Sequence, residues 1–225
     1  MREEREFIGI FRFFACFTPE GIFFSGVFIM KNKHTLYLTK VACLSAVAAL
    51  LMLLEFPLPF APAFYELNFS EVAVLISGFA LGPFAAILTE LIKILLNLII
   101  NGTDTAFIGE LSNFLMGLAF VLPAAYIYKY KKTLLGAVVG MIIGTVSLAV
   151  IGGAVNYFMM IPAYVKFMGF KMETIIGMGN KVNSSITDLK DLILFATIPF
   201  NLVKGLSCSL ITGLIYKQVS PILHK

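Results

Sequence analysis

The sequence predicts an all-α membrane protein in which six transmembrane helices form one bundle. Of its 225 residues, 59% are hydrophobic and 13% are charged, whereas soluble domains carry about 25% charged residues. The mean hydropathy of +0.93 agrees with an integral membrane protein. No fixed-period repeat is visible, so residues 31–225 are expected to form a single six-helix membrane domain.

Residues 1–30 differ from the rest of the chain. Their apolar run, Phe7–Phe17, contains Arg12 and is followed by Pro19 and Glu20. Such a run is too short and too charged to cross a bilayer, and it makes a poor signal peptide. We expect residues 1–30 to be an N-terminal extension that is not folded, with an interfacial anchor as the alternative.

Six apolar segments follow and define the expected spans. Their predicted bounds are Leu36–Phe56, Phe69–Leu81, Phe84–Ile100, Phe107–Tyr128, Leu134–Ile161 and Leu192–Tyr216. The second is short for a transmembrane helix, which needs about 20 residues, and it ends at the turn Gly82-Pro83. The fifth begins with Gly136, Gly140 and Gly144, and small residues four apart let a neighbouring helix approach closely.

The lysines set the expected orientation. They cluster before or early in the first span, after the fourth and after the sixth, at Lys31, Lys33, Lys40, Lys129, Lys131, Lys132, Lys217 and Lys225. With six spans these groups lie on one side of the membrane, and the positive-inside rule makes that side, with both termini, cytoplasmic. The long polar loop Ala163–Lys190 carries four more lysines on the opposite side, which reduces the difference in lysine content between the two sides.

The sequence gives no support for an enzyme. It contains no phosphate-binding Gly-x-x-x-x-Gly-Lys-Ser/Thr motif, no His-Glu-x-x-His and no Gly-x-Ser-x-Gly. Its two histidines and three cysteines are scattered, so neither a metal site nor a disulfide framework is indicated. The net charge of +4 does not imply nucleic acid, because the lysines gather at the ends of spans.

A polar stripe in the last span is the strongest sign of a site. Thr197, Asn201 and Lys204 are separated by four and three residues, so they share one helix face. A lysine near the bilayer centre costs about 2.5–3.5 kcal/mol on insertion scales. Pro199 has no amide hydrogen to donate, which frees the carbonyl of Phe195 and favours a kink beside the stripe.

Other polar and aromatic residues should lie toward the same outer side of the bundle. Asn156 is at the outer end of the fifth span, and the loop Pro57–Asn68 is rich in Pro, Phe and Tyr. Amides, one cation and flat apolar walls suit a planar, polar-edged, largely uncharged solute. The alternatives are an ion pair between Lys204 and a carboxylate of another helix, and a helix–helix hydrogen bond for Asn156.

The remaining charges within spans are open to two interpretations. Glu90 and Lys93 are three residues apart, and we expect them to pair within their own helix rather than conduct protons. Glu110, with Asn113 one turn later, either favours the positive end of its helix or faces a binding cavity. An autonomous ion- or proton-coupled carrier that uses Glu90, Lys93 and Glu110 is the competing function.

Five motifs, in order, are similar to those of a known family. They are Pro57-Leu-Pro-Phe…Phe-Ser-Glu71, Gly78-Phe-Ala-Leu-Gly-Pro83, Gly109-Glu-Leu-Ser-Asn-Phe-Leu-Met-Gly117, Asn156-Tyr-Phe…Ile-Pro162 and Pro199-Phe-Asn-Leu-Val-Lys-Gly205. This set resembles the riboflavin-specific substrate-binding (S) subunit of energy-coupling factor (ECF) transporters, the RibU family. The likeness runs from about Leu36 to Tyr216.

The resemblance implies a subunit that captures riboflavin, or a related flavin such as FMN, outside a prokaryotic cell membrane. Transport would require a transmembrane coupling subunit (T component) and two cytoplasmic ATPases, with no catalytic cofactor in this chain. The alternative within the superfamily is an S subunit for another vitamin. The chain departs from the family in having Asn68-Phe-Ser-Glu71 where Asp-Phe-Ser-Asp is usual.

The resemblance also implies roles for individual residues. Asn156, Asn201 and Lys204 would hydrogen-bond the polar edge of the flavin ring. The first loop would wall or cap the site through Phe64, Tyr65 and Glu66. In the first span, Ala42 and Ala46 resemble the small-residue motif that docks on the coupling subunit, and small residues there permit close helix contact.

Overall fold

The computed structural model describes residues 33–103 and 105–223, so the prediction for residues 1–30 lies outside the described residues. The helices are α2 (Lys33–Met52), α3 (Ser70–Leu81), α4 (Pro83–Asn101), α5 (Ile108–Tyr130), α6 (Leu134–Val155), α7 (Ile161–Phe167), α8 (Met172–Val182), α9 (Leu189–Leu192) and α10 (Ile198–Leu223). Two π-helical segments, η1 (Asn156–Met160) and η2 (Ile193–Thr197), join α6 to α7 and α9 to α10. Strands β1 (Phe56–Pro57) and β2 (Glu66–Leu67) form a short antiparallel hairpin.

Five helical stretches in the described part are long and apolar enough to cross a membrane. They are His34–Met52, Pro83–Asn101, Ile108–Tyr130, Leu134–Phe167 and Leu189–Tyr216. The predicted second span is the 12-residue helix α3, about 18 Å long against a hydrocarbon core of about 30 Å. The mostly helical membrane fold is therefore confirmed, while the count of six spans is not.

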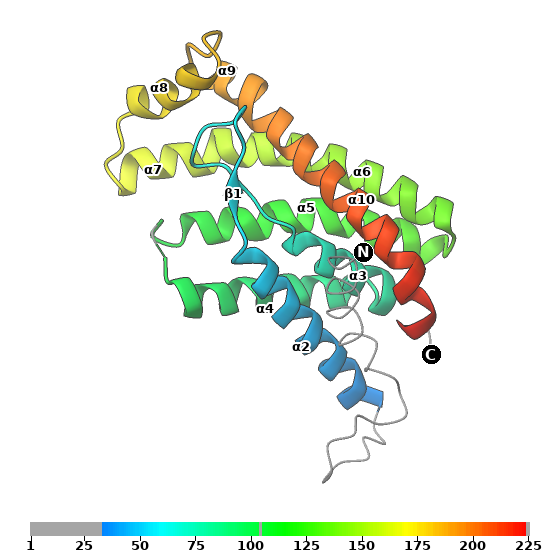
Figure 1. The fold of residues 1–225 in the computed structure, drawn as a ribbon. Helices are drawn as coiled ribbons and strands as arrows, with labels where there is room; N and C mark the ends of the chain where they lie inside the picture. The colour runs from blue at the N-terminus through cyan, green and yellow to red at the C-terminus, as the bar shows by residue number, and fades with distance from the viewer. Residues whose placement is uncertain (1–32, 104, 224–225) are drawn as a thin grey trace, which may run out of the picture.

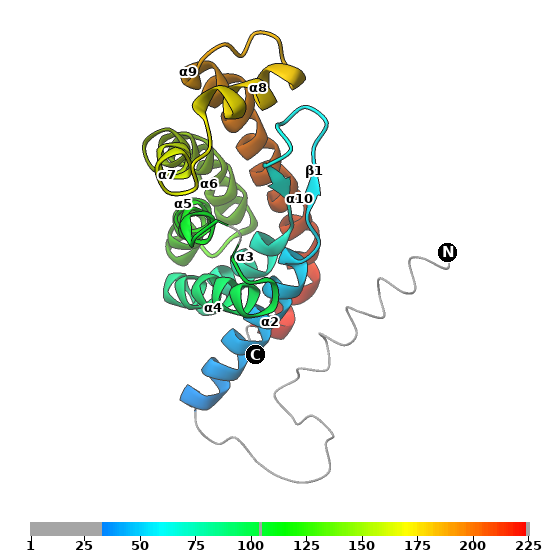
Figure 2. The ribbon, with the colours of Figure 1, turned by 90° about the vertical axis from the view of Figure 1, so that its left-hand side faces the viewer.

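Helix α3 is short and lies inside the bundle. It packs against α2, α4, α5 and α10, and Figure 2 shows it among them. Every residue from Ser70 to Phe79 is buried, including Ser70, Glu71 and Ser77. The predicted turn after it is confirmed: Gly82 has φ 99°, which glycine adopts without strain, and Pro83 begins α4.

The two ends of the bundle differ. The start of α2, the turn between α3 and α4, the connection between α5 and α6 and the end of α10 lie toward the right and lower right in Figure 1. The β hairpin, the connection between α4 and α5, and helices α7 to α9 lie toward the left and top. The start of α2 and the end of α10 thus share one end, the arrangement that an even number of crossings produces.

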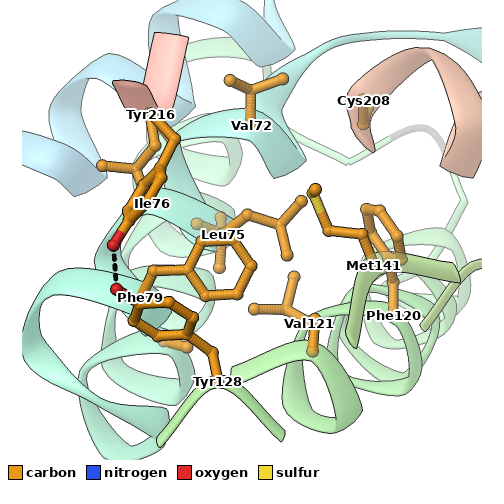
Figure 3. Packing of buried hydrophobic residues seen from close by; sticks show 14 of the residues in the cluster. Val72, Leu75, Ile76, Phe79, Phe120, Val121, Tyr128, Met141, Cys208 and Tyr216 are labelled. Atoms are coloured by element: carbon orange, nitrogen blue, oxygen red, sulfur yellow. Dashed lines mark hydrogen bonds between the residues drawn. The ribbon is translucent and has the colours of Figure 1, made fainter. Parts of the chain in front are cut away.

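An apolar cluster fills the bundle at the end where α10 finishes. Phe79 of α3 lies against Tyr128 of α5 and Tyr216 of α10, with ring centroids 4.9 Å and 5.6 Å away. The hydroxyls of Tyr128 and Tyr216 are hydrogen-bonded to each other (Figure 3). A second cluster, which includes Tyr65 and Phe200, lies beneath the hairpin at the opposite end.

The two π segments share a sequence feature. Both are five residues long and both are followed by Ile-Pro, at Pro162 and Pro199. In each, the amide of the isoleucine donates to the carbonyl five residues earlier, Asn156 or Ile193. Proline cannot supply the next amide, so the turn before it widens. The disturbance predicted at Pro199 takes the form of this wider turn.

Close packing of α5 on α6 depends on two of the predicted glycines. A Cβ on Gly144 would lie 2.3 Å from the backbone oxygen of Phe120, and one on Gly140 would lie 2.8 Å from that of Ala124. Gly136 differs, since its Cβ would meet the backbone oxygen of Lys131, just after α5, at 2.1 Å. The close helix approach expected from the glycine spacing is therefore confirmed for Gly140 and Gly144.

We expect Gly144→Ala to destabilise the fold by about 1–3 kcal/mol, because a backbone atom cannot move away as a side chain can. Gly177→Ala is the matched control, since a Cβ there has no neighbour within 4 Å and alanine favours a helix. The measurement is the midpoint of thermal unfolding in detergent. Equal midpoints for the two variants would contradict this account of the α5–α6 contact.

Candidate functional site

A cavity of about 280 Å³ lies between the hairpin and helices α3, α5 and α10, close to the lower end of the range for small-molecule sites, about 300–1,000 Å³. All eight residues predicted to contact a ligand line it: Phe64, Tyr65, Glu66, Glu110, Asn113, Asn156, Asn201 and Lys204. The structure thus brings together side chains from four separate stretches of the sequence. Their contact with a ligand stays a prediction.

Lys204 is 8% exposed and lines this cavity. Among the residues that the structure describes, its ammonium has neither an ion-pair nor a hydrogen-bond partner. The alternative that Lys204 pairs with a carboxylate of another helix is therefore not supported. Its ammonium is therefore available to an acceptor group of a ligand in the cavity.

Asn201 lies beside Lys204 on α10 and faces α6. A Cβ on Gly152 would lie 2.5 Å from its Nδ2, so the amide rests directly on the α6 backbone. Its side chain is 3% exposed and, within the described ranges, makes no hydrogen bond. The cavity therefore offers a free amide and a free ammonium one helical turn apart.

The buried ion pairs of the described residues gather around Lys93. Its Nζ is 2.7 Å from Glu90 Oε1 and 2.8 Å from Glu71 Oε1, and it donates to Ser70 Oγ at 3.3 Å. The predicted pairing of Glu90 with Lys93 is confirmed. The third member, Glu71, comes from α3 and was not predicted as a partner.

Tyr65 joins the hairpin to both π segments. Its hydroxyl donates to Asn156 Oδ1 at 3.1 Å and shares a hydrogen bond of 2.7 Å with Thr197 Oγ1. Asn156 in turn donates through Nδ2 to the carbonyl of Gly152 at 2.8 Å. Asn156 therefore lines the cavity but already uses its amide within the protein, through bonds to the hairpin loop and to its own helix α6.

Aromatic rings form one wall of the cavity. The ring of Tyr65 stacks on Phe200 with centroids 5.2 Å apart and an interplanar angle of 23°. Phe64 packs against Tyr65, with ring centroids 4.5 Å apart. Flat rings held in this way offer a surface on which a planar ligand can lie.

Carboxylates surround the rest of the cavity. Glu110 is in the first turn of α5 and accepts a hydrogen bond from Thr105 Oγ1 at 3.0 Å. The sequence left open whether Glu110 favours the positive end of its helix or faces a cavity. In the structure it lies at the positive end of α5 and also lines the cavity. Across from it, Glu55 Oε1 accepts from Asn68 Nδ2 at 3.0 Å.

Partial burial, followed by a hydrogen bond with Glu66, raises the pKa of Glu55 from 4.5 to about 7. A carboxyl whose pKa is higher in the folded state binds more protons there, so stability should fall as the pH rises from about 4.5 to about 7. We expect Glu55→Gln to flatten this part of the profile, measured as thermal midpoint against pH. An unchanged slope in the variant would show that another group is responsible.

The comparisons with known proteins agree with this architecture. Residues 36–216 match the family model described as "ECF transporter, substrate-specific component". The chain belongs to this family.

Similar proteins include the riboflavin transporter RibU of Staphylococcus aureus (strain TCH60), 34% identical over 88% of this chain and 95% of that protein. The riboflavin transporter FmnP of Bacillus subtilis (strain 168) is 32% identical over 85% of this chain and 94% of that protein. A solved structure, "Structure and mechanism of the S component of a bacterial ECF transporter", is 30% identical, with a TM-score of 0.67 over 86% of this chain and 100% of that chain. These relatives are transport proteins, which confirms the prediction that the chain is a transport subunit and not an enzyme.

Within this ECF substrate-specific component, sequence reasoning missed several cavity residues. Those not predicted include Glu55, Asn68, Glu71, Ser112, Met116 and Tyr164. Glu71 carried a usable signal, because a carboxylate near the start of an apolar segment requires a partner. Ser112 carried none, since serine is ordinary in a membrane helix.

The two alanines predicted to dock a coupling subunit lie on the outer face of α2. Ala42 and Ala46 are exposed, whereas Val41, Ser45 and Ala49 of the same helix are buried. Their face is therefore accessible to another helix, as docking requires.

Proposed function

We propose that this ECF substrate-specific component binds riboflavin in the cavity lined by Asn201 and Lys204. The observation that carries the proposal is an unpaired ammonium and an unpaired amide beside a stacked aromatic wall. Together they suit a flat heterocycle with hydrogen-bonding groups along one edge. The similar proteins, which include riboflavin transporters of three further genera, support the same ligand.

The subunit also has an expected place in the membrane and in a larger transporter. We infer that residues 31–225 form one domain in a prokaryotic cell membrane, with α3 as a short sixth crossing and both termini cytoplasmic. The lysines near the ends of α2, α5 and α10 support that orientation. The cavity then opens outward, and a T component with two ATPases powers transport, docking through Ala42 and Ala46.

Purified protein in detergent tests the ligand directly. A yellow protein that quenches added riboflavin fluorescence with one site per chain is the expected result, and a colourless protein without quenching would overturn the proposal. FMN serves as the second ligand. Because Glu55, Glu66 and Glu110 line the cavity against one cation, Lys204, the dianionic phosphate should weaken binding relative to riboflavin.

The autonomous ion-coupled carrier is less well supported. Glu90 and Lys93 are fully buried in contact with each other and do not line the cavity. Riboflavin uptake into liposomes that contain this chain alone would favour that alternative.

A further inference from the structure

Four buried side-chain oxygens in the described part of the chain have no hydrogen-bond partner. They are Glu71 Oε2, Glu90 Oε2, Ser112 Oγ and Thr212 Oγ1. Native proteins leave few such atoms, and each calls for an explanation. Glu71 and Ser112 line the cavity, whereas Glu90 and Thr212 do not. The set therefore divides into two atoms whose residues line the cavity and two whose residues do not.

Ser112 and Thr212 differ from the other buried hydroxyls on the helices. Ser45 and Thr145 each donate to the carbonyl four residues earlier, at 2.8 Å, the usual way for a hydroxyl in a helix to be satisfied. Ser112 makes no such bond although it is 0% exposed. Its neighbours along α5 that line the cavity include Gly109, Asn113 and Met116, so the unused hydroxyl lies on the cavity side of the helix.

Glu71 presents only half of its carboxylate to Lys93. Oε1 accepts from the ammonium at 2.8 Å, while Oε2 has no partner. The start of α3 also lies against α10, where Cys208 Sγ is 3.9 Å from the carbonyl oxygen of Asn68. Lys204 lies one turn before Cys208 on α10 and, like Glu71, lines the cavity. An acceptor without a partner and an ammonium without a partner therefore lie on two neighbouring elements that both line the cavity.

We propose that Glu71 and Ser112 are ligand-contact residues, with Glu71 Oε2 accepting a hydrogen bond from a ligand N–H and Ser112 Oγ bonding a second polar group. This inference rests on the proposed function. It narrows the ligand to an uncharged heterocycle that carries an N–H donor next to a carbonyl, the carbonyl being bonded by Lys204. The imide edge of riboflavin has this pattern, and a ring methylated at that nitrogen lacks it.

The chain supplies a matched control for each residue. Ser112→Ala and Thr212→Val both remove an unsatisfied buried hydroxyl, and Glu71→Gln and Glu90→Gln both remove one carboxylate partner of Lys93. We expect Ser112→Ala and Glu71→Gln each to raise the Kd for riboflavin about tenfold relative to the matched control. Fluorescence quenching measures the Kd, and unfolding of the ligand-free variants reports on their stability.

A ligand analogue makes the test independent of folding. Riboflavin methylated at the imide nitrogen should bind the parent protein about tenfold more weakly than riboflavin, and Glu71→Gln should reduce this difference. Affinities equal to those of the control variants, or no penalty for the methylated analogue, would overturn the inference while leaving riboflavin binding intact. If Glu71→Gln does not fold, the comparison of Ser112→Ala with Thr212→Val and the methylated analogue decide. Failure of the parent protein to bind riboflavin would instead overturn the proposed function.

Discussion

Replacing Lys93 by methionine should destabilise the protein by about 3–5 kcal/mol, because it leaves two buried carboxylates without a counter-ion. Glu71 and Glu90 both reach Lys93 through Oε1, at 2.8 Å and 2.7 Å, and neither side chain is more than 2% exposed. Methionine keeps most of the lysine's volume, so the loss measures charge and not a cavity. Thermal unfolding in detergent is the measurement.

Lys129→Met is the control for this prediction, since Lys129 is exposed at the end of α5. Its unfolding midpoint should match that of the parent. A midpoint for Lys93→Met equal to that of Lys129→Met would mean that the carboxylates become protonated at little cost, and the ion pairs would then contribute little to stability.

Replacing Lys204 by methionine should have opposite effects on binding and on stability. Loss of a charged hydrogen-bond donor should weaken riboflavin binding about 100-fold. The ligand-free protein should become more stable, because the variant no longer buries a cation that lacks a partner in the described structure. The two measurements are the Kd from fluorescence quenching and the unfolding midpoint without ligand.

Comparison with Lys93→Met separates the two buried lysines. If Lys204→Met loses stability as Lys93→Met is expected to, then Lys204 is a structural residue. If it binds riboflavin like the parent, the site is misassigned.

Much of the fold follows from apolar periodicity and the positions of turns. The long helices lie where apolar runs predict them, and the turn at Gly82-Pro83 ends α3 as expected. The length of α3 could not be predicted in the same way. An apolar segment that other helices enclose has the composition of one that lipid encloses, so hydropathy does not show which of the two surrounds it.

The conformation of the long loop before the last span could not be predicted. It contains the end of α7 and the whole of α8, Met172–Val182. An amphipathic helix of this length has too few apolar residues to stand out in a hydropathy profile, although its buried residues, Ile175 and Gly179, are four apart.

The gathering of the eight predicted residues could be anticipated because polar groups in membrane helices face an interior or a cavity. The sequence could not show which of these polar groups already have a hydrogen-bond or ion-pair partner within the protein. The partner of Lys93 in α3 is 22 residues away in sequence, and Asn156 is bonded to Tyr65, 91 residues away. Such distant pairs leave no local pattern, so the free groups that matter for binding emerge only from the fold.

The hydroxyl of Tyr65 ties three separate parts of the chain at one oxygen atom. A displacement of the segment that carries it breaks the bond to Asn156 and the bond to Thr197 together. Movement of the hairpin away from these helices would therefore cost both hydrogen bonds. The wide turns at Asn156–Met160 and Ile193–Thr197 carry the two side chains that hold the hairpin in place through Tyr65.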